Sequence, residues 1–183
     1  MRRPKLLLVQ MAGAPGTGKS TLATALGRQL RAVVLDRDVV KSALLDAEVG
    51  WERAGAAAQE VVFATADSLL AQGLSVVVDS PAHYALIPER GLAIARDRAA
   101  AYRFIECTCR DLEEIGRRLA GRTRRRSQWI GLDTPAPDGQ SNAEQVGPHR
   151  WRTYGPSGGW LVLDTSAPVE ASLAAAIRYL NLS

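Results

Sequence analysis

The stretch of sequence that decides the fold is Gly13-Ala14-Pro15-Gly16-Thr17-Gly18-Lys19-Ser20. It matches the pattern G-x-x-x-x-G-K-[ST] at every position. Glycines allow the backbone to turn tightly, so that its N–H groups point at phosphate oxygens, and the N-terminus of the following helix adds partial positive charge. We expect Lys19 to reach the β- and γ-phosphates and the Ser20 hydroxyl to coordinate Mg²⁺. The motif, extended to Thr21, therefore predicts a site for ATP or another nucleoside triphosphate together with Mg²⁺.

Apolar runs and helical patterns alternate on both sides of this loop. The run 6–11 before it predicts a buried strand, and Leu22, Leu26 and Leu30 after it fall on one face of a helix. Further strands are expected at 32–35, 75–78, 102–109 and 160–163, and further helices at 38–47, 53–71, 88–99, 111–122 and 169–180. This alternation is typical of an α/β fold with three layers, in which helices flank a five-stranded parallel sheet. The length of 183 residues fits a single domain over 1–183.

Residues 131–159 interrupt the alternation. They contain six glycines and four prolines in 29 positions and show little apolar periodicity. Loops of this length in a compact domain are usually functional or disordered. We expect a substrate-facing flap or a tether here, with a weak helical pattern at 142–146.

Composition and charge narrow the class of protein. The net charge of +4 suits an anionic ligand but is small for a nucleic-acid-binding protein. Cys107 and Cys109 are too close in sequence for a favourable disulfide, and neighbouring zinc ligands are lacking, which favours reduced cysteines. The apolar run 6–9 after the basic N-terminus is too short for a signal peptide or a membrane span. We expect a cytoplasmic protein without membrane contact, as a monomer or a homodimer.

Asp79 directly follows the apolar run 74–78. A carboxylate at the end of a buried strand is where P-loop proteins place a magnesium ligand, usually acting through water. The competing interpretation is a turn or helix cap, because Ser80-Pro81 follows. We predict that Asp79 and Ser20 form the metal site.

The tripeptide Asp36-Arg37-Asp38 follows the second predicted strand and should face the same crevice, because the carboxyl ends of parallel strands open to one side. Transfer of phosphate to an alcohol needs a carboxylate that accepts or orients the hydroxyl proton. We choose Asp38 as this base and Asp36 as the second choice, with Arg37 holding substrate or phosphate. Helix capping by either aspartate is the competing interpretation.

Arginines are concentrated after the fourth predicted strand, at Arg117, Arg118, Arg122, Arg124, Arg125 and Arg126. Guanidinium groups neutralise a transferring phosphoryl group and also stack on adenine. A solvated basic helix end would look the same, because the helix dipole favours cations there. We predict an arginine-rich lid over about 117–130 in which at least two arginines contact the nucleotide.

With these motifs the chain resembles the small P-loop kinases of the nucleoside-monophosphate-kinase-like superfamily, and within it chloramphenicol phosphotransferase and the 5′-hydroxyl polynucleotide kinases. The Arg37-Asp38 pair resembles their catalytic aspartate site. The run Arg118-Leu119-Ala120-Gly121-Arg122 is similar to the first lid arginines of adenylate kinases, which implies that Arg118 packs on adenine and Arg122 contacts phosphates.

The run 163–168 resembles the late turn beside adenine in these kinases, which implies adenine contacts for Ser166 and Pro168. The arginine pattern that binds a nucleoside monophosphate in adenylate kinases is not found in the sequence.

Three functions follow as hypotheses. The first is an ATP-dependent kinase that phosphorylates a hydroxyl of a small molecule such as an antibiotic, sugar or nucleoside, with Asp38, Lys19, Arg122 and Arg37 as catalytic residues. The second is a polynucleotide 5′-hydroxyl kinase, because Arg124–Arg126, Arg150 and Arg152 alternate with Trp129, Trp151 and Tyr154. The third is a non-catalytic, nucleotide-gated regulatory protein that uses 131–159 as its partner surface.

Overall fold

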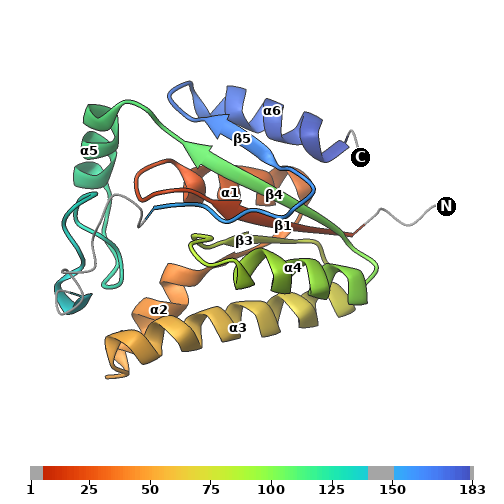
Figure 1. Ribbon diagram of the computed structural model, residues 1–183, viewed down its shortest axis with the longest axis horizontal. Helices are drawn as coiled ribbons and strands as arrows, with labels where there is room; N and C mark the ends of the chain where they lie inside the picture. Colours follow the sequence, from red (N-terminus) through yellow and green to blue (C-terminus); the bar gives the residue numbers. More distant parts are fainter. Residues whose placement is uncertain (1–5, 140–150, 182–183) are drawn as a thin grey trace.

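The computed structural model describes residues 6–139 and 151–181 (Figure 1). The helix expected at 142–146 and the residue Arg150 lie outside the described residues.

Five strands form one sheet, and every pair of neighbours is parallel. They are β1 (Leu7–Ala12), β2 (Val33–Asp36), β3 (Val76–Asp79), β4 (Ala101–Thr108) and β5 (Leu161–Asp164). Their order across the sheet is β2-β3-β1-β4-β5, so β1 lies at the centre. After β1, the chain forms β2 and β3 on one side of it and then β4 and β5 on the other side. Such a reversal leaves a crevice beyond the carboxyl end of the central strand, where ligands bind in open α/β sheets.

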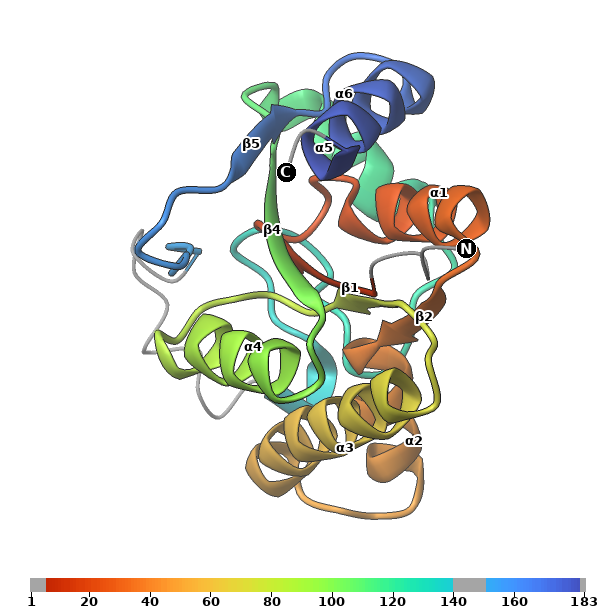
Figure 2. The same cartoon turned by 90° about the vertical axis from the view of Figure 1, so that its right-hand side faces the viewer.

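Helices cover both faces of the sheet (Figures 1 and 2). They are α1 (Lys19–Leu30), α2 (Arg37–Asp46), α3 (Trp51–Ala71), α4 (Leu86–Asp97), α5 (Leu112–Gly121) and α6 (Val169–Asn181). One face carries α1 and α6, and the other carries α3 and α4, with α2 packed beside α3. Helix α5 follows the carboxyl end of β4, at the same edge as the glycine-rich loop after β1.

The central strand explains why two core layers form. Val9 and Met11 point into the cluster with α1 and α6, whereas Leu8 points into the cluster with α3 and α4. Successive side chains on a strand face opposite sides, so a largely apolar run can bury both faces. The one polar residue of β1, Gln10, is also buried and donates to the Ser80 carbonyl oxygen. The helices and strands predicted within the described residues are all present, with ends that differ from expectation by one or two residues.

The two cysteines differ in environment. Cys107 is buried in β4, whereas Cys109 lies just past the strand and is half-buried, and both are free. The expectation of two core cysteines is therefore right only for Cys107. Within 6–139 and 151–181, none of the helices is long and apolar enough to cross a membrane.

Candidate functional site

The glycine-rich loop adopts a conformation that its glycines make accessible. Gly13, Gly16 and Gly18 have φ values of 125°, 79° and 77°, a region that side chains disfavour. Space is also limiting, because a Cβ on Gly13 would lie 2.1 Å from the carbonyl oxygen of Cys107. A Cβ on Gly16 would lie 2.8 Å from Ile115 Cγ2. The loop is thus packed tightly against β4 and α5.

Lys19 begins α1 at the end of this loop and donates a hydrogen bond from Nζ to the Ala14 carbonyl oxygen at 2.7 Å. Burial lowers the pKa of Lys19, and the carboxylate of Asp79 opposes this shift. The ammonium group is therefore held inside the curve of the loop, close to the end of β3.

Asp79 is the last residue of β3 and is only 5% exposed. Burial raises its pKa to about 6, although Lys19 and a hydrogen bond from Ser20 favour the ionised form. A buried carboxylate beside a hydroxyl at a phosphate loop fits a magnesium ion that is bound mostly by water and phosphate oxygens. Among the described residues, no cluster of three His, Cys, Asp or Glu side chains forms a metal cage. Ser20 and Asp79 are thus the chain's own groups that would hold Mg²⁺.

The two aspartates after β2 have different surroundings. Asp36 caps α2, because its Oδ1 accepts hydrogen bonds from the backbone N–H of Asp38 at 2.8 Å and of Val39 at 3.4 Å. Burial raises the pKa of Asp36. Both aspartates line the cavity described below, but the side chain of Asp38 is 33% exposed and is not used as a cap. The structure therefore leaves Asp38 available for a substrate, and its role as the base stays a prediction.

Arg37 is anchored next to Asp38. One of its terminal nitrogens donates to the Gly55 carbonyl oxygen at 3.0 Å, and another lies 4.0 Å from Asp38 Oδ1. Burial lowers the pKa of Arg37. Its guanidinium group lines the same cavity.

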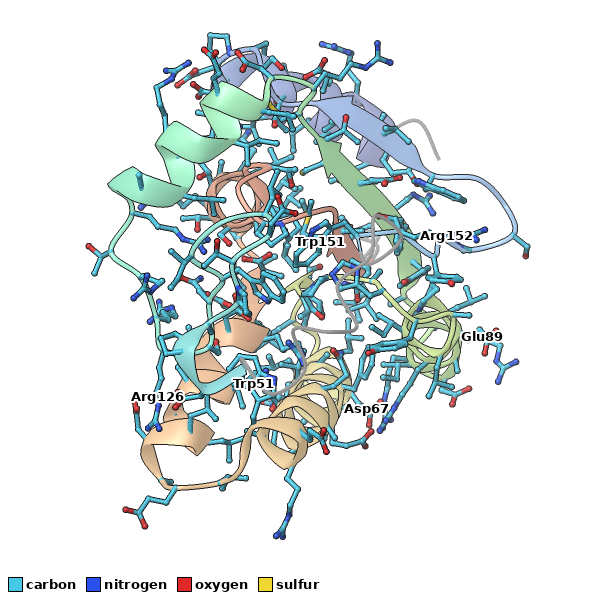
Figure 3. The ribbon with its side chains drawn as sticks, turned by 60° about the vertical axis from the view of Figure 1, so that its left-hand side comes forward. Trp51, Asp67, Glu89, Arg126, Trp151 and Arg152 are labelled. Atoms are coloured by element: carbon cyan, nitrogen blue, oxygen red, sulfur yellow. The ribbon has the colours of Figure 1, made fainter. Side chains whose placement is uncertain are left out.

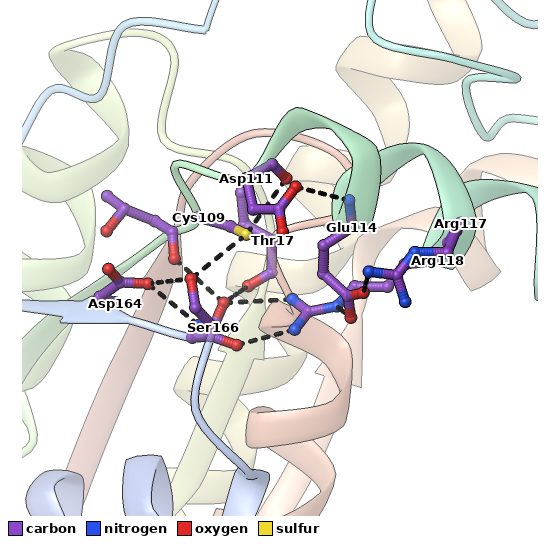
Figure 4. Close-up of polar contacts among 10 residues, drawn as sticks. Thr17, Cys109, Asp111, Glu114, Arg117, Arg118, Asp164 and Ser166 are labelled. Carbon is purple, nitrogen blue, oxygen red and sulfur yellow. Dashed lines mark hydrogen bonds and ion pairs between the residues drawn. The ribbon is translucent and has the colours of Figure 1, made fainter.

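Arg118 connects three parts of the site (Figure 4). Its Nε donates to Glu114 Oε1 at 2.7 Å, and its terminal nitrogens donate to the carbonyl oxygen of Thr165 at 2.8 Å and to Thr165 Oγ1 at 3.3 Å. Thr165 Oγ1 in turn donates to the Thr17 carbonyl oxygen at 2.9 Å. Helix α5, the turn after β5 and the phosphate loop are therefore joined by one polar network.

Arg122 lies near the other predicted catalytic groups. Its pKa is lowered, mainly by burial, while Asp38 favours its charged form, and its charge in turn lowers the pKa of Lys19. One terminal nitrogen donates to the Trp129 carbonyl oxygen at 2.7 Å. Its Nε is buried without a hydrogen-bond partner among the described residues. Such a group favours an incoming anion.

Three of the other arginines of the cluster are engaged in ion pairs. Arg117 pairs with Glu114 at 2.7 Å and Arg125 with Asp36 at 3.7 Å. Arg126 pairs with Asp138 at 2.7 Å and with Asp46 at 3.3 Å, and donates to the Leu45 carbonyl oxygen. Figure 3 shows Arg126 beside α2. Much of the cluster therefore attaches the segment after α5 to α2.

The turn after β5 contains Ser166 and Pro168, for which the resemblance implies adenine contacts. Ser166 donates from both its backbone N–H and its hydroxyl to Asp164 Oδ1, at 3.0 and 2.6 Å. Within the described chain, Thr165 and Ala167 line the cavity and Ser166 and Pro168 do not. Adenine contacts by Ser166 and Pro168 stay a prediction.

A single cavity of about 1710 Å³ joins these groups. One end is formed by the phosphate loop, Arg118 and the turn after β5. The other end lies among α2, α3, the loop after β3 and the segments 121–129 and 151–154. Lys19, Asp79, Asp38 and Arg122 are all among the residues that line it.

Two features of this site have no recognisable signal in the sequence. Ser127 Oγ donates to the Asp38 carbonyl oxygen at 3.2 Å and accepts from Ser42 Oγ at 2.9 Å. This pair and Thr165 join residues more than 80 and 140 positions apart, respectively. Isolated Ser and Thr residues give no sequence pattern that would reveal such pairings.

The sequence was compared with known families. The family model described as an AAA domain matches residues 8–140. The chain belongs to this AAA domain family. No curated protein matches the sequence significantly.

Solved structures show the same fold as this AAA domain chain. A candidate kinase from Chloroflexus aurantiacus J-10-fl is 24% identical, with a TM-score of 0.73 over 97% of this chain and 100% of the other. The APS kinase of Mycobacterium tuberculosis, solved with AMPPNP and APS, is 21% identical, with a TM-score of 0.63 over 97% and 98%. A sugar kinase from Janibacter sp. HTCC2649 is 17% identical, with a TM-score of 0.64 over 98% and 96%. The predicted P-loop fold, with a five-stranded parallel sheet flanked by helices, is confirmed.

Proposed function

We propose that this protein is an ATP-dependent kinase that transfers the γ-phosphate to a hydroxyl group of a small molecule. The observation that carries the proposal is the continuity of the cavity. It runs from the phosphate loop past Asp38 to a second region among α2, α3 and the loop after β3. A protein that only binds a nucleotide needs no second region, whereas a kinase needs an acceptor site adjoining the γ-phosphate.

The residues suit an in-line transfer. Lys19 and Arg122 bind phosphate oxygens, and Ser20 with Asp79 would hold a magnesium ion, which would offset negative charge on the phosphates. The acceptor oxygen forms a bond to the γ-phosphorus, while the bond from that phosphorus to the β,γ-bridging oxygen breaks and ADP leaves. Asp38 accepts the proton of the hydroxyl, and Arg37 orients the acceptor. Residues 117–130 act as the lid of a single domain over 1–183.

The proposal is tested by exchanging each aspartate after β2 for asparagine. Asp38→Asn should lower kcat by roughly 10²–10⁴-fold, the usual contribution of a general base, and leave ATP affinity unchanged. Asp36→Asn is the matched control, because asparagine also caps helices well. We expect it to stay within a few fold of the parent. ATP consumption over alcohol-bearing metabolites, sugars, nucleosides and antibiotics, chloramphenicol included, supplies the assay.

Two outcomes would contradict the assignment. If Asp36→Asn loses turnover and Asp38→Asn keeps it, Asp36 is the base. If no hydroxyl acceptor is phosphorylated although ATP binds, the protein is the regulatory alternative and not a kinase.

A polynucleotide 5′-hydroxyl kinase is the second candidate. Arg152 lies over the ring of Tyr154 at 5.2 Å, a pairing that suits stacked bases. Against it, Arg125 and Arg126 are held by carboxylates and offer little free charge to a phosphate backbone. Binding of a 5′-hydroxyl oligonucleotide that weakens steeply with salt would favour this candidate.

A further inference from the structure

The acceptor end of the cavity is rich in aromatic side chains. Three of the four tryptophans in the chain line the cavity, together with two of the four tyrosines. They are Trp51, Trp129, Trp151, Tyr84 and Tyr154. Aromatic rings hold ligands mainly through apolar area and ring stacking, and they do so with little loss of side-chain entropy.

Trp151 is the centre of a connected aromatic group, which we call the aromatic wall and define as Trp129, Trp151 and His83. The ring centroids of Trp129 and Trp151 are 5.0 Å apart at an interplanar angle of 83°, and those of His83 and Trp151 are 5.3 Å apart at 62°. Trp151 Nε1 also donates to the Leu132 carbonyl oxygen at 3.3 Å. The rings are therefore held in fixed orientations before a ligand arrives.

The aromatic wall is tied to the predicted chemistry. Arg122 donates to the carbonyl oxygen of Trp129, and Ser127, two residues before Trp129, donates to the carbonyl oxygen of Asp38. The loop after β3 completes the attachment, because the Tyr154 N–H donates to the Ala82 carbonyl oxygen at 2.9 Å. A group packed on the wall would thus lie beside the base and the phosphate-binding arginine.

Trp51 has a different role. The Nζ of Lys41 lies 3.2 Å from the centroid of its ring, and a Cβ on Gly139 would lie 2.7 Å from its Cζ2. Its ring is already covered by the chain itself. Figure 3 shows Trp51 at the start of α3, apart from Trp151. The aromatic wall is therefore defined without Trp51.

We propose that the acceptor is an alcohol that carries a planar ring, aromatic or heteroaromatic, which packs on the aromatic wall while its hydroxyl reaches Asp38. This inference rests on the proposed kinase function and names the class of its substrate. It ranks ring-bearing alcohols above ring-free polyols and open-chain sugars.

The first experiment measures transfer from ATP to matched alcohols, using tryptophol, 2-phenylethanol and adenosine against glycerol, sorbitol and a 5′-hydroxyl oligonucleotide. Ring-bearing alcohols should show kcat/KM values up to about tenfold above those of glycerol and sorbitol, given the usual strength of aromatic contacts. Preference for glycerol or sorbitol would overturn the inference and leave the kinase proposal intact. Preference for the oligonucleotide over adenosine would overturn it in favour of a nucleic-acid substrate.

Variants of the wall supply the second experiment. Trp151→Leu and Trp129→Leu should each raise the KM of the ring-bearing acceptor by roughly tenfold, with the KM of ATP unchanged, and Trp151→Phe should restore most of the loss. Trp160→Phe is the matched control, because Trp160 packs on Phe104 at 5.9 Å, donates to Glu106 and does not line the cavity among the described residues. Unchanged acceptor KM values in both leucine variants would refute the wall's role.

Binding without ATP separates the inference from the proposed function. Tryptophan fluorescence of the Trp160→Phe variant is measured during titration with 2-phenylethanol. This alcohol is chosen over tryptophol because it lacks an indole ring, so that all tryptophan emission comes from the protein. Saturable quenching that disappears in the double variant Trp160→Phe/Trp151→Leu supports the wall even if transfer is never observed. Absence of quenching together with absence of transfer would overturn the inference.

Discussion

At the scale of single residues, burial at the end of β3 raises the pKa of Asp79 from 3.8 to about 6. The folded protein then holds a proton that the unfolded chain releases between these two values. Stability is therefore expected to fall as the pH rises from about 4 to about 6 and to stay level above that range. Lys19 and the Ser20 hydroxyl limit this loss without removing it.

Asp79→Asn tests this sign directly. Asparagine cannot ionise, so the unfolding free energy of the variant should not fall over this pH range. In the parent the fall amounts to about 3 kcal/mol, for a difference of roughly two pH units between the folded and unfolded pKa of Asp79. The measurement is the free energy of unfolding in urea at pH 4 and pH 7, for parent and variant. The unfolding free energy of the variant should increase relative to that of the parent as the pH rises. A difference that is equal at both pH values would show that Asp79 has an ordinary pKa.

At the scale of elements, the segment after α5 is fastened to α2 by a buried pair of hydroxyl groups. Ser127 is 4% exposed, its N–H donates to Ser42 Oγ at 3.1 Å, and its own hydroxyl donates to the Asp38 carbonyl oxygen. The same segment carries Arg122 and Trp129. The position of Asp38 relative to the phosphate-binding arginine therefore depends on this contact.

Ser127→Ala should weaken the attachment. Loss of a buried hydroxyl leaves its partners unsatisfied, at a cost of about 1–3 kcal/mol in unfolding free energy. We expect kcat to fall with little change in the KM of ATP. Ser68→Ala, on the exposed face of α3, is the control and should change stability by less than about 0.5 kcal/mol. Equal effects of the two substitutions would argue against a fastening role for Ser127.

At the scale of the whole molecule, ligand binding at the centre of the sheet should stabilise both halves. The phosphate loop follows β1, and Thr165 joins it to the turn after β5. A nucleotide seated there contacts elements from both ends of the chain. Its binding energy is therefore expected to appear as stability of the entire fold.

The expected size can be measured by thermal unfolding. Magnesium and ATP at 100 times the Kd should add about 2.7 kcal/mol, which corresponds to a rise in Tm of roughly 5–10 °C for a protein of this length. The rise should be smaller without magnesium and absent in Lys19→Ala. An equal rise in Lys19→Ala would show that the nucleotide binds somewhere other than the phosphate loop.

The sequence by itself determined the features that depend only on residues close together in the chain. The glycine-rich loop is one continuous stretch of sequence. Its spacing therefore predicts which backbone positions need glycine and where the phosphate-binding lysine lies. The runs 6–11 and 74–78 predicted buried strands because a strand covered on both faces is rich in apolar side chains. The P-loop fold followed from these local signals in alternation with helical patterns.

Only the tertiary structure decided which of several similar residues is free. Asp36 and Asp38 are alike in sequence and both line the cavity, but the first caps α2 and pairs with Arg125, whereas the second is not used as a cap. Likewise, Arg122 is left without an ion pair among the described residues, while Arg126 is held by two carboxylates from distant segments. The sheet order and the aromatic wall also depend on contacts between residues far apart in the chain. Such pairings form only when the folded chain brings distant segments together, and local residue patterns do not encode them.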